Sequence, residues 1–170
     1  MYSIEVTSLA GSTEDLQEGT AKYLWALAVD NEGNVLVLEK GHRGIWRIDN
    51  TTGEMTKLAV DMAQFHLPEG LAVDARGDMF VADSGTHRVS RIDSKTGAVT
   101  TLAGGTRGIL DETNEAQFEA PTDVTVNAEG TVYVADMNND CIRQIHGTTG
   151  AVTTLAGSVK GLQDGLGTEA

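Results

Sequence analysis

Short apolar runs separated by turn residues recur along the chain. In the middle of the sequence these runs are bounded by Gly, Asp, Ser and Thr, and they are Leu71–Val73, Met79–Ala82, Val89–Ile92 and Val99–Leu102. Their β-branched and aromatic content and their short length are typical of strands. Helical periodicity is not sustained over any useful window. The pattern therefore predicts an antiparallel meander of four strands.

Two kinds of turn join the predicted strands. Asp74–Gly77 separates the first two strands, and a glycine in its fourth place suits a tight hairpin that needs a positive φ. Asp93–Gly97 joins the third and fourth strands and also has the composition of a hairpin. Equivalent turns stand at residues 30–33 and 127–130, and at residues 49–53 and 146–150.

The same succession of runs and turns occurs three times. Residues 70–74, 80–83 and 98–104 recur at 123–127, 133–136 and 151–157, and more loosely between residues 26 and 60. A period of roughly 40–50 residues indicates one supersecondary unit per repeat, whose apolar face is covered by its neighbours. A β-solenoid is the alternative, but its coils are usually much shorter. We predict an all-β fold, a β-propeller of four-stranded antiparallel blades.

The repeats predict how the propeller segment is divided. The expected parts are an orphan outer strand at 1–11, blades at 21–60, 61–104 and 114–157, and a linker toward a missing blade at 158–170. Two such chains in a six-bladed ring would have one surplus strand each. We therefore expect three complete blades in an open or partial ring, cut from a larger propeller, with self-association through the bare faces of the end blades.

The second repeat resembles an NHL repeat from end to end. The residues that carry this resemblance are Ala63–Phe65, Pro68–Asp74, Gly77, Phe80–Asp83, Thr86–Val89 and Gly97–Gly104. The chain lacks the Asn-His-Leu signature, although Thr86-His87-Arg88 is close to its common Asn-His-Arg variant. Residues 139–141 and 42–44 depart from it. The resemblance covers nearly the whole chain and implies a β-propeller that, as in many members of the family, recruits a protein or peptide.

The composition of the chain narrows the classes of molecule that it is expected to bind. The chain has 12 basic and 25 acidic residues among 170, a formal charge of −13, which repels phosphate backbones and anionic lipid surfaces. We therefore expect no nucleic acid and no membrane partner, and no stretch has the roughly 20 apolar residues of a membrane helix. Cys141 is the single cysteine, so there is no intrachain disulfide framework. None of this indicates a compartment.

Candidate binding residues gather at one end of the predicted blades. The turns between the second and third strands and the linkers between blades lie on the same face, and loops on a rigid scaffold commonly bind partners. The candidates on this face are Glu39, His42, Arg43, Asp83, His87, Arg88, Asp136 and Asp140. A structural interpretation competes for the recurring Asp83 and Asp136, because each can accept backbone N–H bonds in its own turn.

The sequence offers little for catalysis. No nucleophile elbow, phosphate-binding loop or His-Glu-x-x-His motif occurs, and we expect no catalytic residue, metal or cofactor. The equivalent carboxylates of Glu39, Asp83 and Asp136 could instead ring a central channel around a calcium-sized cation. Cys141 is interpreted as a partly buried small residue, and Trp25 and Trp46 as filling space between blades.

Three functions remain open at this point. The first is a non-catalytic scaffold module of a larger protein that binds a protein or peptide. The alternative is part of a metal-dependent six-bladed propeller enzyme, lactonase-like or amidating-lyase-like, as relatives of the resembled fold imply. The third is a structural spacer without a ligand.

Overall fold

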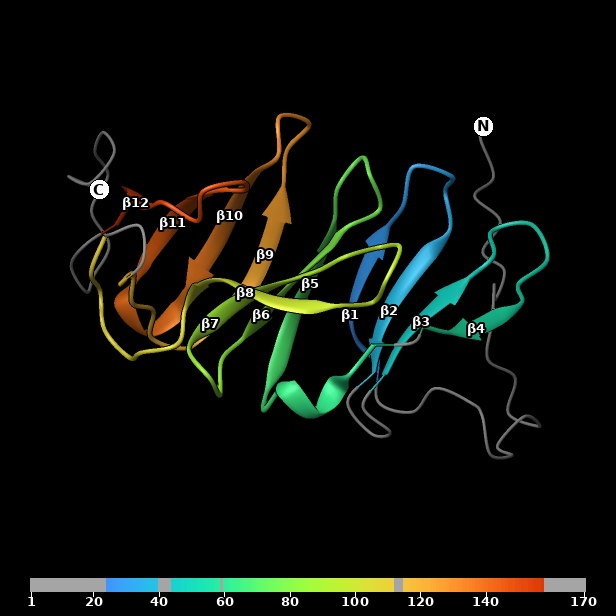
Figure 1. Cartoon of the computed structure of the whole chain (residues 1–170), viewed down its shortest axis with the longest axis horizontal. Coiled ribbons are helices and arrows are strands. Elements are labelled where there is room, and N and C mark those ends of the chain that lie inside the picture. Colours follow the sequence, from blue (N-terminus) through green and yellow to red (C-terminus); the bar gives the residue numbers. More distant parts are fainter. Residues whose placement is uncertain (1–23, 40–43, 59, 112–114, 158–170) are drawn as a thin grey trace, which may run out of the picture.

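The computed structural model describes residues 24–39, 44–58, 60–111 and 115–157 (Figure 1). Its regular elements are three four-stranded sheets and two single turns of 3-10 helix. The first sheet consists of β1 (Leu24–Val29), β2 (Val35–Glu39), β3 (Gly44–Ile48) and β4 (Met55–Lys57). The second consists of β5 (Pro68–Val73), β6 (Met79–Asp83), β7 (Arg88–Ile92) and β8 (Val99–Gly104). The third consists of β9 (Pro121–Val126), β10 (Thr131–Asp136), β11 (Cys141–His146) and β12 (Val152–Ala156).

Each sheet is a meander in which every strand pairs antiparallel with the next one in sequence. The 3-10 turns η1 (Met62–Gln64) and η2 (Met137–Asn139) lie outside the sheets. The predicted four-stranded antiparallel blades are thus confirmed, and we call the three sheets blades 1, 2 and 3. The expected strand at 1–11 and the linker at 158–170 lie outside the described residues.

The blades have equivalent registers, so positions can be compared between them. Three cross-strand pairs occupy the same place in successive blades, and they are Val37–Trp46, Val81–Ser90 and Val134–Arg143. The hairpin glycines are equivalent too, because Gly33, Gly77 and Gly130 have φ values of 84°, 85° and 82°. The left-handed backbone that the sequence predicted for these turns is therefore present.

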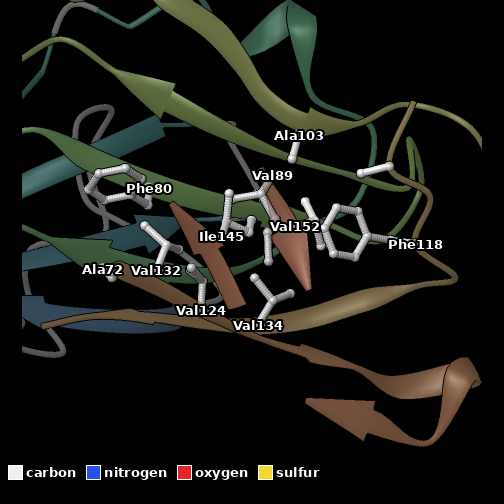
Figure 2. Packing of buried hydrophobic residues seen from close by; sticks show 12 residues of the cluster. Ala72, Phe80, Val89, Ala103, Phe118, Val124, Val132, Val134, Ile145 and Val152 are labelled. Atoms are coloured by element: carbon white, nitrogen blue, oxygen red, sulfur yellow. The ribbon is translucent and has the colours of Figure 1, made fainter. Parts of the chain in front are cut away.

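Apolar side chains fill the spaces between neighbouring blades (Figure 2). The cluster between blades 2 and 3 includes Phe80 and Val89 from one blade and Phe118, Val132 and Ile145 from the other, all at most 2% exposed. A second cluster joins blades 1 and 2 in the same way, with Leu38 and Ile45 against Leu71 and Val81. Each sheet is thus covered by its neighbour, as the propeller arrangement requires.

The first strands of the blades lie side by side, β1 next to β5 and β5 next to β9. Gly70 in β5 makes the closest approach, because a Cβ atom there would lie 2.7 Å from the Cα of Asp123 and 2.8 Å from the nitrogen of Val124. Any larger side chain would force the two backbones apart. This glycine sets the spacing of the inner strands between blades 2 and 3.

The described residues form an open, partial ring. Figure 1 shows blade 1 and blade 3 at opposite ends of the array, with blade 2 between them. Large apolar side chains are exposed on both end blades, with Leu27 and Val29 each 62% exposed in blade 1, and Ile142 40% and Leu155 45% exposed in blade 3. The all-β propeller predicted from the sequence is confirmed.

Candidate functional site

Among the described residues, the loop face comprises the start of β1, the end of β2, the turns after β6 and β10 and the segments that enter β5 and β9. Three carboxylates that the sequence placed here, those of Glu39, Asp83 and Asp136, are fully buried. Asp83 accepts hydrogen bonds from the backbone nitrogens of His66 at 2.9 Å and Leu67 at 2.8 Å, and from Gly85 at 3.2 Å. These bonds tie the segment that enters blade 2 to the end of the second strand of the same blade.

Asp136 performs the equivalent task in blade 3. Its carboxylate accepts hydrogen bonds from the backbone nitrogen of Glu119 at 2.7 Å, from Asn139 Nδ2 at 2.8 Å and from Arg143 Nη1 at 2.9 Å. Burial raises the pKa of Asp136, while the bonds from Asn139, Glu119 and Arg143 each act to lower it. The recurring aspartates therefore have a structural task, and their main backbone partners lie before the blade's first strand rather than only in the aspartate's own turn.

Arg143 is the fully buried partner of Asp136, and the sequence analysis did not select it. Its guanidinium also donates to the carbonyl oxygens of Gln117 at 2.8 Å and Leu110 at 2.9 Å, and it forms an ion pair with Asp111. Asp111 in turn accepts a hydrogen bond from the backbone nitrogen of Thr154 in β12 at 2.9 Å. Arg143 thus fastens the described parts of the linker between blades 2 and 3 to blade 3.

Arg88 plays a related part in blade 2 from a different position. Arg143 lies 5.1 Å from the ring centre of Phe118 and donates to the carbonyl oxygen of Gln117. Arg88 lies 5.9 Å from the equivalent ring of Phe65 and donates to the carbonyl oxygen of Gln64.

The strand registers show how the two arginines reach equivalent places from different positions in the sequence. Position 88 in blade 2 corresponds to Cys141 in blade 3, and Arg143 corresponds to Ser90. The two positions are i and i+2 along the strand, so both side chains point to the same face of the strand.

His87 and Asp140 occupy equivalent left-handed positions, with φ values of 53° and 51°. The imidazole Nδ1 of His87 accepts a hydrogen bond from the backbone nitrogen of Ala120 at 3.2 Å, which links the turn of blade 2 to the entry of blade 3. Asp140 is exposed, whereas His87 and Arg88 are half-buried. The structure thus brings these three predicted residues to the accessible loop face, and His42 and Arg43 lie outside the described residues.

Exposed apolar side chains form a second feature of this face, which we call the apolar rim. The rim consists of Leu24, Trp25, Leu67 and Met137, exposed by 56%, 51%, 38% and 54%. In blade 2, Leu67 precedes β5 and its carbonyl oxygen accepts a hydrogen bond from Ser84 at 3.0 Å. In blade 3 the equivalent bond runs from the nitrogen of Met137 to Ala120 at 3.3 Å. Each blade therefore presents an exposed apolar side chain near the entry of its first strand.

Neither tryptophan lies in the clusters between the described blades, which differs from the sequence-based expectation. Trp46 is buried and packs with Val37 and Ile48, and the ammonium of Lys57 lies 5.6 Å from its ring centre. Trp25 is half-exposed instead of filling space between blades. It stands at the shift in register between β1 and β2, where the regular alternation of buried and exposed positions is interrupted.

Polar groups surround the apolar rim. Glu69 accepts a hydrogen bond from Ser84 Oγ at 3.0 Å, and Glu119 forms an ion pair with the exposed Arg107. Cys141 is buried, and its burial together with the charge of Asp136 raises the pKa of its thiol to about 11. No group of three His, Cys, Asp or Glu side chains within the described ranges is placed to hold a metal ion.

The opposite face carries two grooves between neighbouring blades, of about 360 Å³ and 140 Å³. The larger is lined by Asp30, Arg47 and Arg76, and the smaller by Arg76, Arg91 and His146. Arg47 and Arg91 already form ion pairs, with Asp30 and Asp78 respectively. Two of the arginines in these grooves are thus already paired with carboxylates, and the loop face, which exposes apolar side chains, is the stronger candidate for a binding surface. None of the described helices has the length and apolar character needed to span a membrane.

Comparison with known proteins identifies the repeat. Residues 65–92 match the family model of the NHL repeat, which confirms the resemblance seen in the sequence. No curated protein matches the chain.

Solved structures share the fold. A nidogen/laminin complex is similar with a TM-score of 0.65 and 23% identity over 80% of this chain and 49% of that chain. A gluconolactonase from Xanthomonas campestris is similar with a TM-score of 0.62 and 16% identity, over 80% and 48% of the two chains. A virginiamycin B lyase from Staphylococcus aureus is similar with a TM-score of 0.58 and 16% identity, over 84% and 43%. The chain thus spans less than half the length of each of these structures, and at these identities the likeness concerns the fold alone.

Proposed function

We propose that the chain is a non-catalytic scaffold module of a larger protein, and that it binds a protein or peptide through its loop face. The observation that carries this proposal is the apolar rim. Leu24, Trp25, Leu67 and Met137 are all more than a third exposed, although each stands on or beside a regular strand or turn. One or two apolar side chains are exposed at the same end of each blade, which offers a partner repeated apolar contacts along this face.

The setting of the rim suits recognition. Asp83 fixes the backbone of Leu67 directly, because it accepts a hydrogen bond from the backbone nitrogen of Leu67. Asp136 accepts a bond from the nitrogen of Glu119, and the next residue, Ala120, accepts the bond from the nitrogen of Met137. A rigid backbone reduces the entropy lost when a partner binds. The surrounding polar groups of His87, Arg88 and Asp140 would form a polar edge around an apolar centre, the usual anatomy of a protein interface.

Charge supports a protein rather than a nucleic acid as the partner. The chain carries a formal charge of −13, and phosphate backbones bind where basic side chains cluster. One similar structure comes from a nidogen/laminin complex, in which a protein of this fold occurs with a protein partner. We therefore propose a polypeptide partner and no nucleic acid.

A peptide selection tests the proposal. The protein is immobilised, peptides are selected from a display library, and the affinities of the selected peptides are measured by biolayer interferometry. Changing Leu67→Ser or Met137→Ser is expected to weaken binding roughly tenfold to a hundredfold, because burying one such side chain contributes about 1.5–3 kcal/mol.

The matched control is Lys95→Ser, an exposed position in a turn on the opposite face. It should leave the affinity unchanged. Selected peptides that bind both rim variants as tightly as the parent protein would place the binding surface elsewhere and refute the proposal. Metal analysis of the same preparation addresses the enzyme alternative, since a stoichiometric ion that survives dialysis would favour it.

A further inference from the structure

The outer strands of blades 2 and 3, β8 and β12, carry no charged residue. They lie within residues 96–106 and 144–159, the two longest stretches of the chain without Asp, Glu, Lys or Arg. Each stands at the edge of its sheet, so one side of the strand is not paired with another described strand. Proteins commonly protect such edges with charged residues or proline, and β8 has neither.

The backbone of β8 presents two residues to the outside of the blade. The carbonyl oxygen of Ala98 accepts a hydrogen bond from the nitrogen of Asp93 at 3.0 Å, so Ala98 faces the β7 side. Successive residues of a strand direct their N–H and C=O groups to alternate sides. Thr100 therefore also faces β7, whereas Val99 and Thr101 face outward. None of the described residues bonds to the outward backbone groups of Val99 and Thr101.

The equivalent edge of blade 3 is covered at this point. Thr154 in β12 stands at the position of Thr101, because their cross-strand partners Arg143 and Ser90 are equivalent. The carboxylate of Asp111 accepts hydrogen bonds from the nitrogen of Thr154 at 2.9 Å and from its Oγ1 at 3.1 Å. The linker between blades 2 and 3 thus satisfies the outward N–H of β12. No described residue takes the same place beside Thr101, which is exposed whereas Thr154 is half-buried.

We propose that the outer edge of blade 2 binds an extended segment of a partner polypeptide, which adds to β8 as a fifth strand. The outward N–H and C=O groups of Val99 and Thr101 supply the hydrogen bonds, and this mode of recognition is β-strand addition. The exposed side chains of Thr100 and Thr101 are β-branched and suit cross-strand contacts. This edge belongs to the outer strand and not to the loop face, so the proposal is independent of the binding proposed above.

Charge favours a partner segment over a second copy of the chain. Two copies each carry a formal charge of −13 and repel one another. A segment without acidic residues is not repelled, and the uncharged edge of β8 places no like charge opposite it. The partner segment is therefore expected to be extended and to lack Asp and Glu.

The edge that can pair is short. Ser90 pairs with Thr101 and Val89 pairs with Ala103, so Leu102 is an extra residue that forms a bulge in β8. An added strand therefore pairs regularly only as far as Thr101. We expect an isolated strand to bind with low affinity, and the test needs a method that detects weak binding.

Nuclear magnetic resonance of the isotope-labelled 170-residue chain tests the proposal. The probe is a capped peptide of alternating valine and threonine with a lysine at each end, so it has no acidic residue. Titration should shift the amide signals of Val99 and Thr101, and it should slow the exchange of the Thr101 amide proton with solvent. The amide of Thr154, which already donates to Asp111, should not change.

Two comparisons separate backbone pairing from other contacts. Thr101→Pro removes the outward N–H and should weaken binding of the probe about fivefold, the factor that corresponds to one net hydrogen bond of ~1 kcal/mol. The control Ala128→Pro places a proline in an exposed turn of blade 3 and should bind the probe like the parent. A probe with N-methylated amides keeps its side chains but has no backbone donors, and it should not bind. This second comparison needs no protein variant, so it decides even if Thr101→Pro does not fold.

Several results would overturn the proposal. They are equal binding by the N-methylated probe, signal shifts confined to the loop face around Leu67 and Met137, and no shift at millimolar probe. A chain that dimerises without the probe, with broadened signals at Val99 and Thr101, would assign the edge to a second copy and overturn it as well.

Discussion

Replacing Arg143 with methionine removes one fully buried guanidinium and leaves the carboxylate of Asp136 in place. The side chain of Arg143 is 0% exposed and donates at 2.9 Å to that carboxylate, whose own side chain is also 0% exposed. Methionine retains much of the apolar stem of the arginine but loses the guanidinium group, which lies 5.1 Å from the ring centre of Phe118. The substitution therefore tests the charge and its hydrogen bonds more than the packing.

The expected loss of stability is large. Breaking a buried ion pair by removing one partner costs about 3–5 kcal/mol, because the remaining charge stays buried. Two carbonyl oxygens, those of Leu110 and Gln117, also lose their donor. Since domains of this size unfold with about 5–15 kcal/mol, we expect a loss of roughly a fifth or more of the total.

The dependence on pH identifies the cause. Burial raises the pKa of Asp136 and Arg143 lowers it, so the pKa should rise further in Arg143→Met. A carboxyl group whose folded-state pKa exceeds its unfolded-state value destabilises the fold above the folded-state pKa, and this effect fades as the pH falls below it. The difference between variant and parent should therefore be largest at neutral pH and smaller in acid.

Urea denaturation followed by far-UV circular dichroism measures these differences. Arg88→Met is the matched control, because Arg88 also stacks on a phenylalanine but forms its hydrogen bond with a backbone carbonyl. It should lose only about 1 kcal/mol. Adding Asp136→Asn to Arg143→Met should restore at least about 1 kcal/mol by removing the unpaired charge. Equal losses for both arginine variants, with no dependence on pH, would refute the reasoning.

Three further predictions follow from the polar bonds of the blades. Asp83→Ala leaves the backbone nitrogens of His66 and Leu67 without their acceptor and should lower the free energy of unfolding in urea by about 1–3 kcal/mol. A change near zero would contradict the role of Asp83 in holding the segment that enters blade 2. Because the pKa of Cys141 is raised to about 11, roughly one thiol in a thousand is a thiolate at about pH 8. A disulfide reagent should therefore label Cys141 only as the protein unfolds, and rapid labelling of the native protein would contradict this. His146→Asp should raise the melting temperature measured by calorimetry. His146 accepts the two backbone N–H bonds of its turn at 3.4 and 3.3 Å, whereas the equivalent Asp93 accepts those of its own turn at 3.0 and 2.8 Å. A lower melting temperature would argue against this comparison.

The hydrophobic pattern predicted the blades because short continuous apolar runs supply both faces of a sheet that lies between two neighbours, and β6 is buried at all five of its positions. The turns were predictable for a local reason, since the tight hairpin needs a positive φ at the position of Gly77 and its equivalents, and glycine adopts it without strain. The predicted recurrence of Asp83 and Asp136 was also informative, although their partners come from the segment that enters the blade. These features depend on residues that repeat in register.

Features that depend on one blade alone were not predictable. Arg143 stands where the other blades have Trp46 and Ser90, so comparison of the repeats gave no reason to select it. Arg143 is important because it bonds to Leu110 and Asp111 in the linker between blades 2 and 3, and this linker is not part of the repeated pattern. The exposure of Leu67 and Met137 was missed because an apolar residue next to a strand predicts burial, and only the arrangement of neighbouring turns leaves these two uncovered.

The bonds of Asp83 and Asp136 have a consequence for how the array comes apart. Both carboxylates join the entry of a blade to its own second strand, whereas the space between blades is filled mainly by apolar side chains. Cohesion is therefore polar and directional inside a blade, and nonpolar and nondirectional across its borders. Amide protons should accordingly exchange with solvent in groups that coincide with whole blades, so the array melts as a row of modules and not as a single sheet-rich body.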